Sequence, residues 1–297
     1  MPTDVVIVGG AFAGLAAATY LGRARRSVLI IDKGEPRNRF AAASHGFLGF
    51  DGSNPADILA RAREQLAAYP TVRLINGEAV AARAEDGGFA FTLASGETLT
   101  SRLAILAFGL RDSLDPIPGL AERWGKSVLH CPYCHGYEYS DRRLGVLWRT
   151  PMSVHQASLV AEWGPTTLYL NGADLAPDSA ATLAARGVRV EPARIKALIG
   201  EGTLLQAIEL DDGRESPLDA LYVAPKSTLS SPIAADLGAL IEDGPLGPIL
   251  KTNAEKKTTV PGLYAAGDIA HAPHSVSFAV ADGVMAGTSA HRTLVFG

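Results

Sequence analysis

The stretch that decides the fold is Val5-Val6-Ile7-Val8-Gly9-Gly10-Ala11-Phe12-Ala13-Gly14. An apolar run typical of a buried strand passes into a glycine-rich turn, and the alanine-rich run from Leu15 to Leu21 then predicts a helix. A second apolar run, Val28 to Asp32, predicts the next strand. Strand, turn, helix and strand in this order indicate a βαβ unit of the nucleotide-binding type.

The turn has the chemistry of a pyrophosphate site, because its backbone N–H groups and the positive end of the following helix can receive a dinucleotide. Asp32 ends the second strand, where an acidic side chain can hydrogen-bond a ribose hydroxyl. Ala11 replaces the glycine that usually permits the closest backbone approach, and alanine is small enough to be tolerated. A tight turn without a ligand is the alternative. The predicted dinucleotide-binding residues are Gly9, Gly10, Ala11, Phe12, Ala13, Gly14 and Asp32.

The rest of the chain predicts two α/β domains. Beyond the βαβ unit, the first domain is expected to hold a helix near 58–67 and strands near 72–75, 89–93 and 103–107. A strand–helix alternation restarts at 145–148 and continues with a helix near 153–163, a strand at 166–170, a helix near 177–186 and a strand at 187–190. A final helix is expected from about Ser275, and the last segment is too short to fold alone.

We therefore predict an α/β fold with two Rossmann-like nucleotide-binding domains, the second inserted in the first. Linker-like stretches near 115–119 and 225–232 set the boundaries. The first domain is expected to comprise residues 1–113 and 231–297, and the inserted domain residues 114–230.

Composition argues against several function classes. The chain of 297 residues has a net charge of −4, so no basic surplus is present to neutralise nucleic acid. No apolar run approaches the ~20 residues that a bilayer requires, and no signal sequence is recognisable, so we expect a cytoplasmic protein without membrane contact.

The two cysteines form the pair Cys131-Pro132-Tyr133-Cys134. Such a pair lets one thiolate attack a partner disulfide while the other resolves the mixed disulfide. Because His135 follows, the stretch also matches a c-type haem attachment site, which normally requires export. A zinc site completed by flanking histidines and an inert pair are further alternatives, but we predict redox chemistry and no metal.

The fingerprint, the cysteine pair and the stretch Thr258-Thr259-Val260-Pro261-Gly262-Leu263-Tyr264-Ala265-Ala266-Gly267-Asp268 together resemble the low-molecular-weight thioredoxin reductases over nearly the whole chain. The resemblance implies FAD, a homodimer and an inserted pyridine-nucleotide domain. It implies that Cys134 lies against the flavin and Cys131 faces the substrate, and that the loop 45–49 approaches the isoalloxazine. The cofactor-binding residues it adds are Gly109, Gly267, Asp268, Val276 and Ser277, the last two at the start of the terminal helix.

Two departures from that family bear on function. An acidic residue normally follows the second cysteine, whereas here it is His135, with Glu138 close behind, and an imidazole is a better base near neutrality. The strand ending at Trp148 is followed by Arg149-Thr150-Pro151-Met152-Ser153-Val154-His155-Gln156, which contains no glycine, and no paired arginines follow the next strand. We expect that NADPH binding in the usual mode is lost or badly weakened.

These departures resemble a subgroup of the family, the FAD-dependent dithiol oxidases that close disulfides in natural products such as gliotoxin and holomycin. The resemblance implies that electrons pass from a small dithiol to the cysteines, to FAD and then to oxygen. The predicted catalytic residues are Cys131, Cys134, His135 and Glu138, with His274 as a further candidate whose alternative is a loop or capping role. A thioredoxin-disulfide reductase fed by NAD(P)H at an altered site or by another donor, acting on a thioredoxin-like protein, and a flavin-bound redox sensor remain open.

Overall fold

The computed structural model describes residues 3–297, and these form two compact units. Unit 1 contains the residues up to Arg39 together with Pro55–Asp112 and Ser227–Gly297, and unit 2 contains Phe40–Asn54 and Ser113–Lys226. Both units are α/β, which confirms the predicted fold class. The division by contacts differs from the expected boundaries in three places, because residues 40–54 and Ser113 group with unit 2 and residues 227–230 with unit 1.

Unit 1 is built on one mixed sheet with the strand order β3-β2-β1-β6-β5-β4, and β19 pairs with β6. The parallel strands are β1 (Thr3–Val8), β2 (Val28–Asp32), β3 (Val72–Asn76), β6 (Thr98–Leu106) and β19 (Leu263–Ala265). The antiparallel strands are β4 (Ala79–Glu85) and β5 (Gly88–Leu93). The central strand β1 is almost wholly apolar and buried, as expected for a strand covered on both faces.

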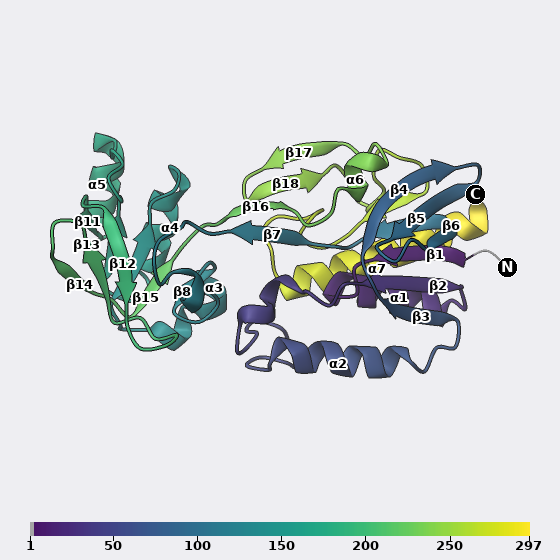
Figure 1. Ribbon diagram of the computed structural model, residues 1–297, viewed down its shortest axis with the longest axis horizontal. Helices are drawn as coiled ribbons and strands as arrows, with labels where there is room; N and C mark the ends of the chain where they lie inside the picture. The colour runs from purple at the N-terminus through teal and green to yellow at the C-terminus, as the bar shows by residue number, and fades with distance from the viewer. Residues whose placement is uncertain (1–2) are drawn as a thin grey trace. The chain divides into compact units, whose positions relative to one another are not determined.

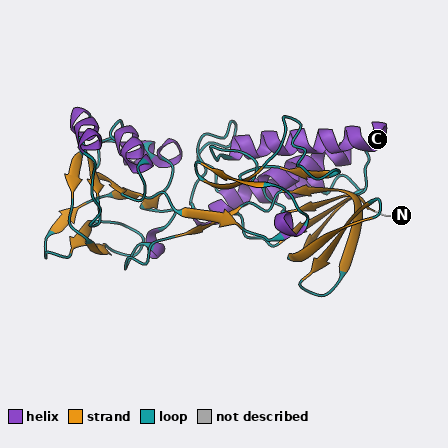
Figure 2. Ribbon diagram, turned by 90° about the horizontal axis from the view of Figure 1, so that it is seen from above, coloured by secondary structure: helices purple, strands orange, loops and turns teal. Residues whose placement is uncertain are grey.

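The main helices of unit 1 are α1 (Phe12–Arg23), α2 (Pro55–Leu66) and α7 (Val276–Phe296). Helices α1 and α7 pack along each other (Figures 1 and 2), and glycine permits this approach. A Cβ on Gly283 would lie 2.1 Å from the carbonyl oxygen of Ala13, and one on Gly287 would lie 2.7 Å from that of Ala17. The C-terminal helix is thereby held against the helix that follows the glycine-rich turn.

Smaller elements complete unit 1. They are the 3-10 helix η1 (Arg37–Phe40), the strands β7 (Leu110–Ser113) and β16 (Lys226–Leu229), the helix α6 (Ile233–Asp236), and the hairpin of β17 (Ile241–Gly244) and β18 (Gly247–Leu250).

Unit 2 contains a parallel sheet with the order β11-β10-β9-β15-β8 and a separate three-stranded antiparallel sheet. The parallel strands are β8 (Val128–Leu129), β9 (Leu144–Leu147), β10 (Thr166–Tyr169), β11 (Arg189–Glu191) and β15 (Ala220–Tyr222). The antiparallel strands are β12 (Ile195–Ile199), β13 (Ala207–Leu210) and β14 (Glu215–Pro217).

The helices of unit 2 are short. They are α3 (Pro132–His135), α4 (Met152–Val160), α5 (Pro177–Ala185) and the 3-10 helices η2 (Ala121–Arg123) and η3 (Tyr137–Tyr139). Helix α3 begins directly after Cys131, which lies two residues beyond the end of β8, and α4 begins shortly after β9. In residues 3–297, we find no helix with the length and apolar character that crossing a bilayer demands.

Candidate functional site

The glycine-rich turn of unit 1 has a backbone that only glycine accommodates at its two ends. Gly9 has φ +107°, and a Cβ there would lie 2.3 Å from the carbonyl oxygen of Ala107. A Cβ on Gly14 would lie 1.8 Å from the carbonyl oxygen of Gly9. Ala11 is the N-cap of α1 and has no side chain that can accept from the first amides of the helix. The residues present therefore fit an anionic diphosphate, because the helix start is left without a side-chain cap.

Asp32 is held beside the turn at the end of β2. Its Oδ1 accepts hydrogen bonds from the backbone N–H groups of Gly10 at 3.1 Å and Gly34 at 3.2 Å. A Cβ on Gly10 would lie 2.7 Å from the Cβ of Asp32, so only glycine fits at this position beside Asp32. Arg63 of α2 donates to Asp32 Oδ2 at 2.7 Å and to the carbonyl oxygen of Gly10 at 3.3 Å.

The segment after β19 meets the same turn. Gly267 has φ +80°, and a Cβ there would lie 3.1 Å from the Cβ of Ala13. The backbone N–H of Gly267 donates to the buried Asp282 of α7 at 3.3 Å. The predicted cofactor residues on the turn and after β19 thus lie together, although their roles toward FAD stay predictions.

The remaining predicted cofactor residues lie at the ends of two elements of unit 1. Gly109, with φ +74°, follows β6. Val276 and Ser277 open α7, whose N-cap Ser275 accepts from the N–H of Phe278 at 3.1 Å. The Phe12 position is the first residue of α1. These positions also remain predictions with respect to the cofactor.

A half-buried charge cluster centred on Arg37 fixes Asp268. Arg37 donates to both carboxylate oxygens of Asp112 at 2.8 and 2.6 Å and to Asp268 Oδ2 at 2.9 Å. Its Nη1 also lies 2.7 Å from Nδ1 of His274. Since a guanidinium only donates, Nδ1 of His274 is the acceptor, and burial lowers the pKa of this imidazole. His274 is therefore a neutral ring within unit 1, bound to Arg37.

The cysteine pair lies in unit 2 at the start of α3, with Cys131 as the N-cap residue and both thiols free. A hydrogen bond from the thiol of Cys134, assisted by the backbone N–H groups of Cys134 and Tyr133, lowers the pKa of Cys131 to about 7 against the opposing effect of burial. The same pairing and burial raise the pKa of Cys134. The two sulfurs are therefore unequal, and Cys131 carries the thiolate.

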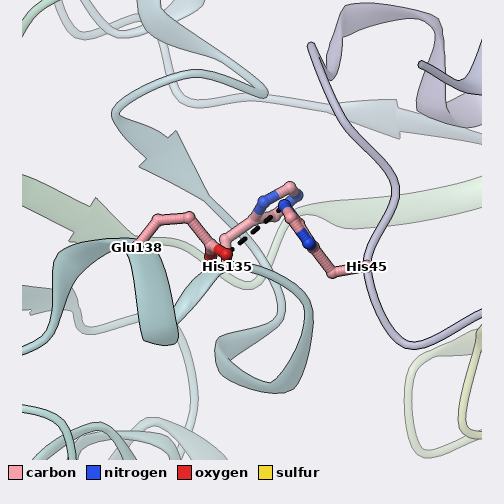
Figure 3. A group of neighbouring side chains, drawn as sticks. All are labelled: His45, His135 and Glu138. Carbon is pink, nitrogen blue, oxygen red and sulfur yellow. Dashed lines mark ion pairs between the residues drawn. The ribbon is translucent and has the colours of Figure 1, made fainter. Parts of the chain in front are cut away.

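His135 and Glu138 gather with a third residue, His45, which the sequence did not assign to catalysis. Figure 3 shows the imidazoles of His45 and His135 and the carboxylate of Glu138 directed toward one another. Nε2 of His45 lies 3.4 Å from Glu138 Oε1, and the two rings meet edge to face with centroids 5.9 Å apart. All three residues belong to unit 2.

The environment of His135 makes it a base rather than an acid near neutrality. Burial, followed by repulsion from His45, lowers its pKa, and attraction to Glu138 acts in the opposite direction. The carbonyl oxygen of His135 accepts from the Tyr222 hydroxyl at 3.3 Å. Gly136 allows the tight turn that follows, because a Cβ there would lie 2.5 Å from the carbonyl oxygen of Pro132.

At the start of α4, where a second pyrophosphate would bind in the usual mode, the backbone N–H groups already donate hydrogen bonds within the chain. The buried Ser153 accepts through Oγ from the backbone N–H groups of Arg149 at 2.9 Å and Thr150 at 3.4 Å. The N–H of Ser153 donates to the carbonyl oxygen of Thr150, and Pro151 has no N–H at all. Arg149 points its guanidinium at Asp115.

Sequence reasoning missed His45, Arg63 and Arg37, which are remote along the chain from the residues they contact. Arg63 has a signal, since it lies on the predicted helix that follows the acid-bearing strand. His45 has a weaker one, because it lies in the glycine-containing loop 45–49, which the resemblance placed near the flavin. Nothing in the sequence pairs Arg37 with Asp112 or Asp268.

The sequence matches the family of pyridine nucleotide-disulphide oxidoreductases over residues 3–283. It is 35% identical to thioredoxin reductase tcpT of Claviceps purpurea, covering 98% of this chain and 94% of that protein. It is 29% identical to thioredoxin reductase sirT of Leptosphaeria maculans over 96% of this chain and 92% of that protein.

Two solved structures resemble this chain over nearly its whole length. An oxidoreductase from Agrobacterium tumefaciens has a TM-score of 0.95 and 45% identity, covering 100% of this chain and 99% of that one. The structure of HlmI has a TM-score of 0.93 and 36% identity, covering 99% of this chain and 93% of that one.

Proposed function

The chain belongs to the pyridine nucleotide-disulphide oxidoreductase family as a thioredoxin reductase-like FAD enzyme, and on that premise we propose that it is a dithiol oxidase. In the proposed reaction, a substrate dithiol loses two electrons and two protons and becomes a disulfide. Molecular oxygen takes up both electrons and both protons and becomes hydrogen peroxide.

One observation carries this direction of electron flow. The backbone N–H groups of Arg149 and Thr150 at the start of α4, which a nicotinamide dinucleotide needs for its pyrophosphate, already donate to Ser153. Binding NADPH in the usual mode would break these bonds and face a proline in place of a donor. An enzyme that cannot take electrons from NADPH has to take them from its dithiol substrate.

The cysteines divide the exchange between them. With the pair oxidised, a substrate thiolate attacks the Sγ of Cys131, the S–S bond breaks, and Cys134 leaves as a thiolate. Burial, which contributes to raising the pKa of Cys134, favours protonation of this sulfur once it has left. The second substrate thiolate then attacks the substrate sulfur of the mixed disulfide, which closes the product and releases Cys131. The lowered pKa of Cys131 makes it a good leaving group.

Protons are handled by His135, with Glu138 and His45 beside it. Each substrate thiol has to lose its proton before it attacks, and a neutral imidazole can accept that proton near neutrality. Glu138 then stabilises the imidazolium. His45, 3.4 Å from Glu138, provides a second imidazole through which the proton can leave.

FAD would supply the two-electron carrier between the reduced cysteine pair and oxygen. The turn Gly9–Gly14 and Asp32 would hold its adenosine diphosphate portion, and Gly267 and Asp268 its ribityl portion. In unit 1, Arg37 orients Asp268 for that task.

We further propose a small dithiol, rather than a protein, as the substrate. Tyr133 lies between the two cysteines and Tyr137 between His135 and Glu138, and both residues are largely exposed. Exposed aromatic rings offer stacking and apolar contact to a compact, partly apolar molecule.

Anaerobic spectroscopy of the purified holoenzyme tests the proposal. We expect dithiothreitol, as a model dithiol, to bleach the oxidised flavin band, and admission of oxygen to restore the band with one peroxide per reduced flavin. NADPH at the same concentration should leave the band unchanged. Rapid bleaching by NADPH would instead support a thioredoxin reductase, the activity for which the relatives tcpT and sirT are named.

A further inference from the structure

We propose that His45, His135 and Glu138 form a binding site for a divalent transition-metal ion of the Zn²⁺ class. The three side chains place one donor atom each within 4.8 Å of one another, two imidazole nitrogens and a carboxylate oxygen. Two imidazoles and one carboxylate are a known ligand set for zinc, with the fourth position left to water or a substrate atom.

The distances suit such an ion. With metal–ligand distances of about 2.0–2.2 Å, two ligand atoms of a tetrahedral zinc site lie about 3.4 Å apart. His45 Nε2 and Glu138 Oε1 already have this separation, at 3.4 Å. The ligand atom of His135 lies within 4.8 Å of the other two (Figure 3), so a side-chain adjustment lets His135 join the same centre.

An outer carboxylate supports the site from behind His45. Asp51 Oδ1 lies 3.7 Å from Nδ1 of His45, on the opposite edge of the ring from Glu138. The N–H of Gly46 holds this oxygen in place with a 2.7 Å hydrogen bond. A carboxylate facing the far nitrogen of a ligating histidine is the usual outer partner in zinc sites, where it orients the ring and raises its basicity.

The ion would act as an inhibitor. A metal bound to His135 and His45 occupies the lone pairs that accept protons from substrate thiols, so occupancy stops dithiol oxidation. This consequence rests on the proposed function, whereas the binding itself does not.

Equilibrium dialysis of the metal-stripped holoenzyme against Zn²⁺ measures binding without reference to activity. We expect one tightly bound Zn²⁺ per chain, not displaced by about a hundredfold excess of Mg²⁺, which prefers oxygen ligands. His45→Gln should weaken binding at least about tenfold, and Asp51→Asn by about tenfold through the outer contact. His155→Gln, an exposed histidine of the same unit, is the matched control and should bind as the wild type does.

The double variant Cys131→Ser/Cys134→Ser separates the cluster from the cysteines. It should keep the Zn²⁺, and loss of binding there would overturn the proposal by making the thiols the ligands. Unchanged binding in His45→Gln, with far-ultraviolet dichroism and flavin content intact, would also overturn it. Zinc that binds as expected but leaves dithiol oxidation undiminished would contradict the proton-handling role and leave the metal site standing.

Discussion

At the scale of single residues, the proposed chemistry uses two pairs of like side chains whose surroundings differ. Cys131 and Cys134 differ because one accepts and the other donates the hydrogen bond between them. Burial lowers the pKa of His135, which directly follows Cys134, and His45 contacts Glu138 from segment 40–54. In the proposed reaction, Cys131 is attacked first and Cys134 leaves, and His135 accepts the proton that His45 then passes on.

The donor role of Cys134 predicts contrasting effects of two substitutions on Cys131. Cys134→Ser keeps a donor, so the pKa of Cys131 should stay near 7, whereas Cys134→Ala removes the largest cause of the shift, and the pKa should rise. The pH dependence of Cys131 alkylation by iodoacetamide in the reduced protein, followed by peptide mass, measures this pKa. Equal midpoints in the two variants would show that the hydrogen bond from the thiol of Cys134 does not lower the pKa of Cys131.

The neighbours of His135 predict shifts of opposite sign in the pH profile. His135 accepts protons only when neutral, so kcat/KM falls as pH drops through its pKa, which lies below the usual ~6.5. His45→Gln removes a repulsion that lowers this pKa, so the acid limb should move to higher pH. Glu138→Gln removes an attraction that raises it, so the limb should move to lower pH. Profiles recorded with EDTA exclude metal, and shifts of the same sign would contradict the arrangement.

At the scale of elements, the sequence predicted the helices and strands whose apolar residues follow a local periodic pattern. The strand at Val28–Asp32 was predicted with its observed bounds, and the terminal helix was expected from about Ser275, its N-cap. The helix expected near 153–163 stops at Val160, and the N–H groups of Glu162 and Trp163 make turn-like bonds to carbonyl oxygens three residues back before Gly164 and Pro165. The hairpin of β17 and β18 escaped prediction because its strands are short, bury only Leu250 and lack an alternating apolar pattern.

The site was predictable to the same extent. Residues of one motif, such as Cys131 to Glu138, are neighbours in sequence, and the structure keeps His135 and Glu138 together. His45 reaches them from segment 40–54, and such a contact arises from tertiary packing that no local pattern encodes. Arg37 joins Asp112 and Asp268 for the same reason.

The first turn of α4 predicts a structural, not catalytic, role for Ser153. Ser153→Ala leaves two N–H groups without their acceptor and should lower the free energy of unfolding by about 1–2 kcal/mol in urea. Ser158→Ala in the same helix is the control, because it removes only a bond to the carbonyl oxygen of Val154 and should cost less than about 0.5 kcal/mol. NADPH should still fail to bleach the flavin in Ser153→Ala, since Pro151 remains. Gain of rapid bleaching would show that Ser153 alone excludes the nucleotide.

At the scale of the whole molecule, the proposed function assigns different halves of the reaction to the two units. The groups that lower the pKa of Cys131 all belong to unit 2, and the turn with its uncapped helix belongs to unit 1. The thiol chemistry therefore needs no group from the cofactor-binding unit to generate its thiolate.

Removal of FAD should separate these halves. The apoprotein should lose peroxide formation, yet alkylate Cys131 with the same midpoint near pH 7, because every hydrogen bond responsible is internal to unit 2. Saturation at about one hundred times the dissociation constant contributes about 2.7 kcal/mol of stability, so loss of FAD should lower the melting temperature by several degrees. Thermal melts and alkylation profiles of apoprotein and reconstituted holoenzyme measure both effects. A rise in the Cys131 midpoint on FAD removal alone would mean that the cofactor, not the local hydrogen bonds, sustains the thiolate.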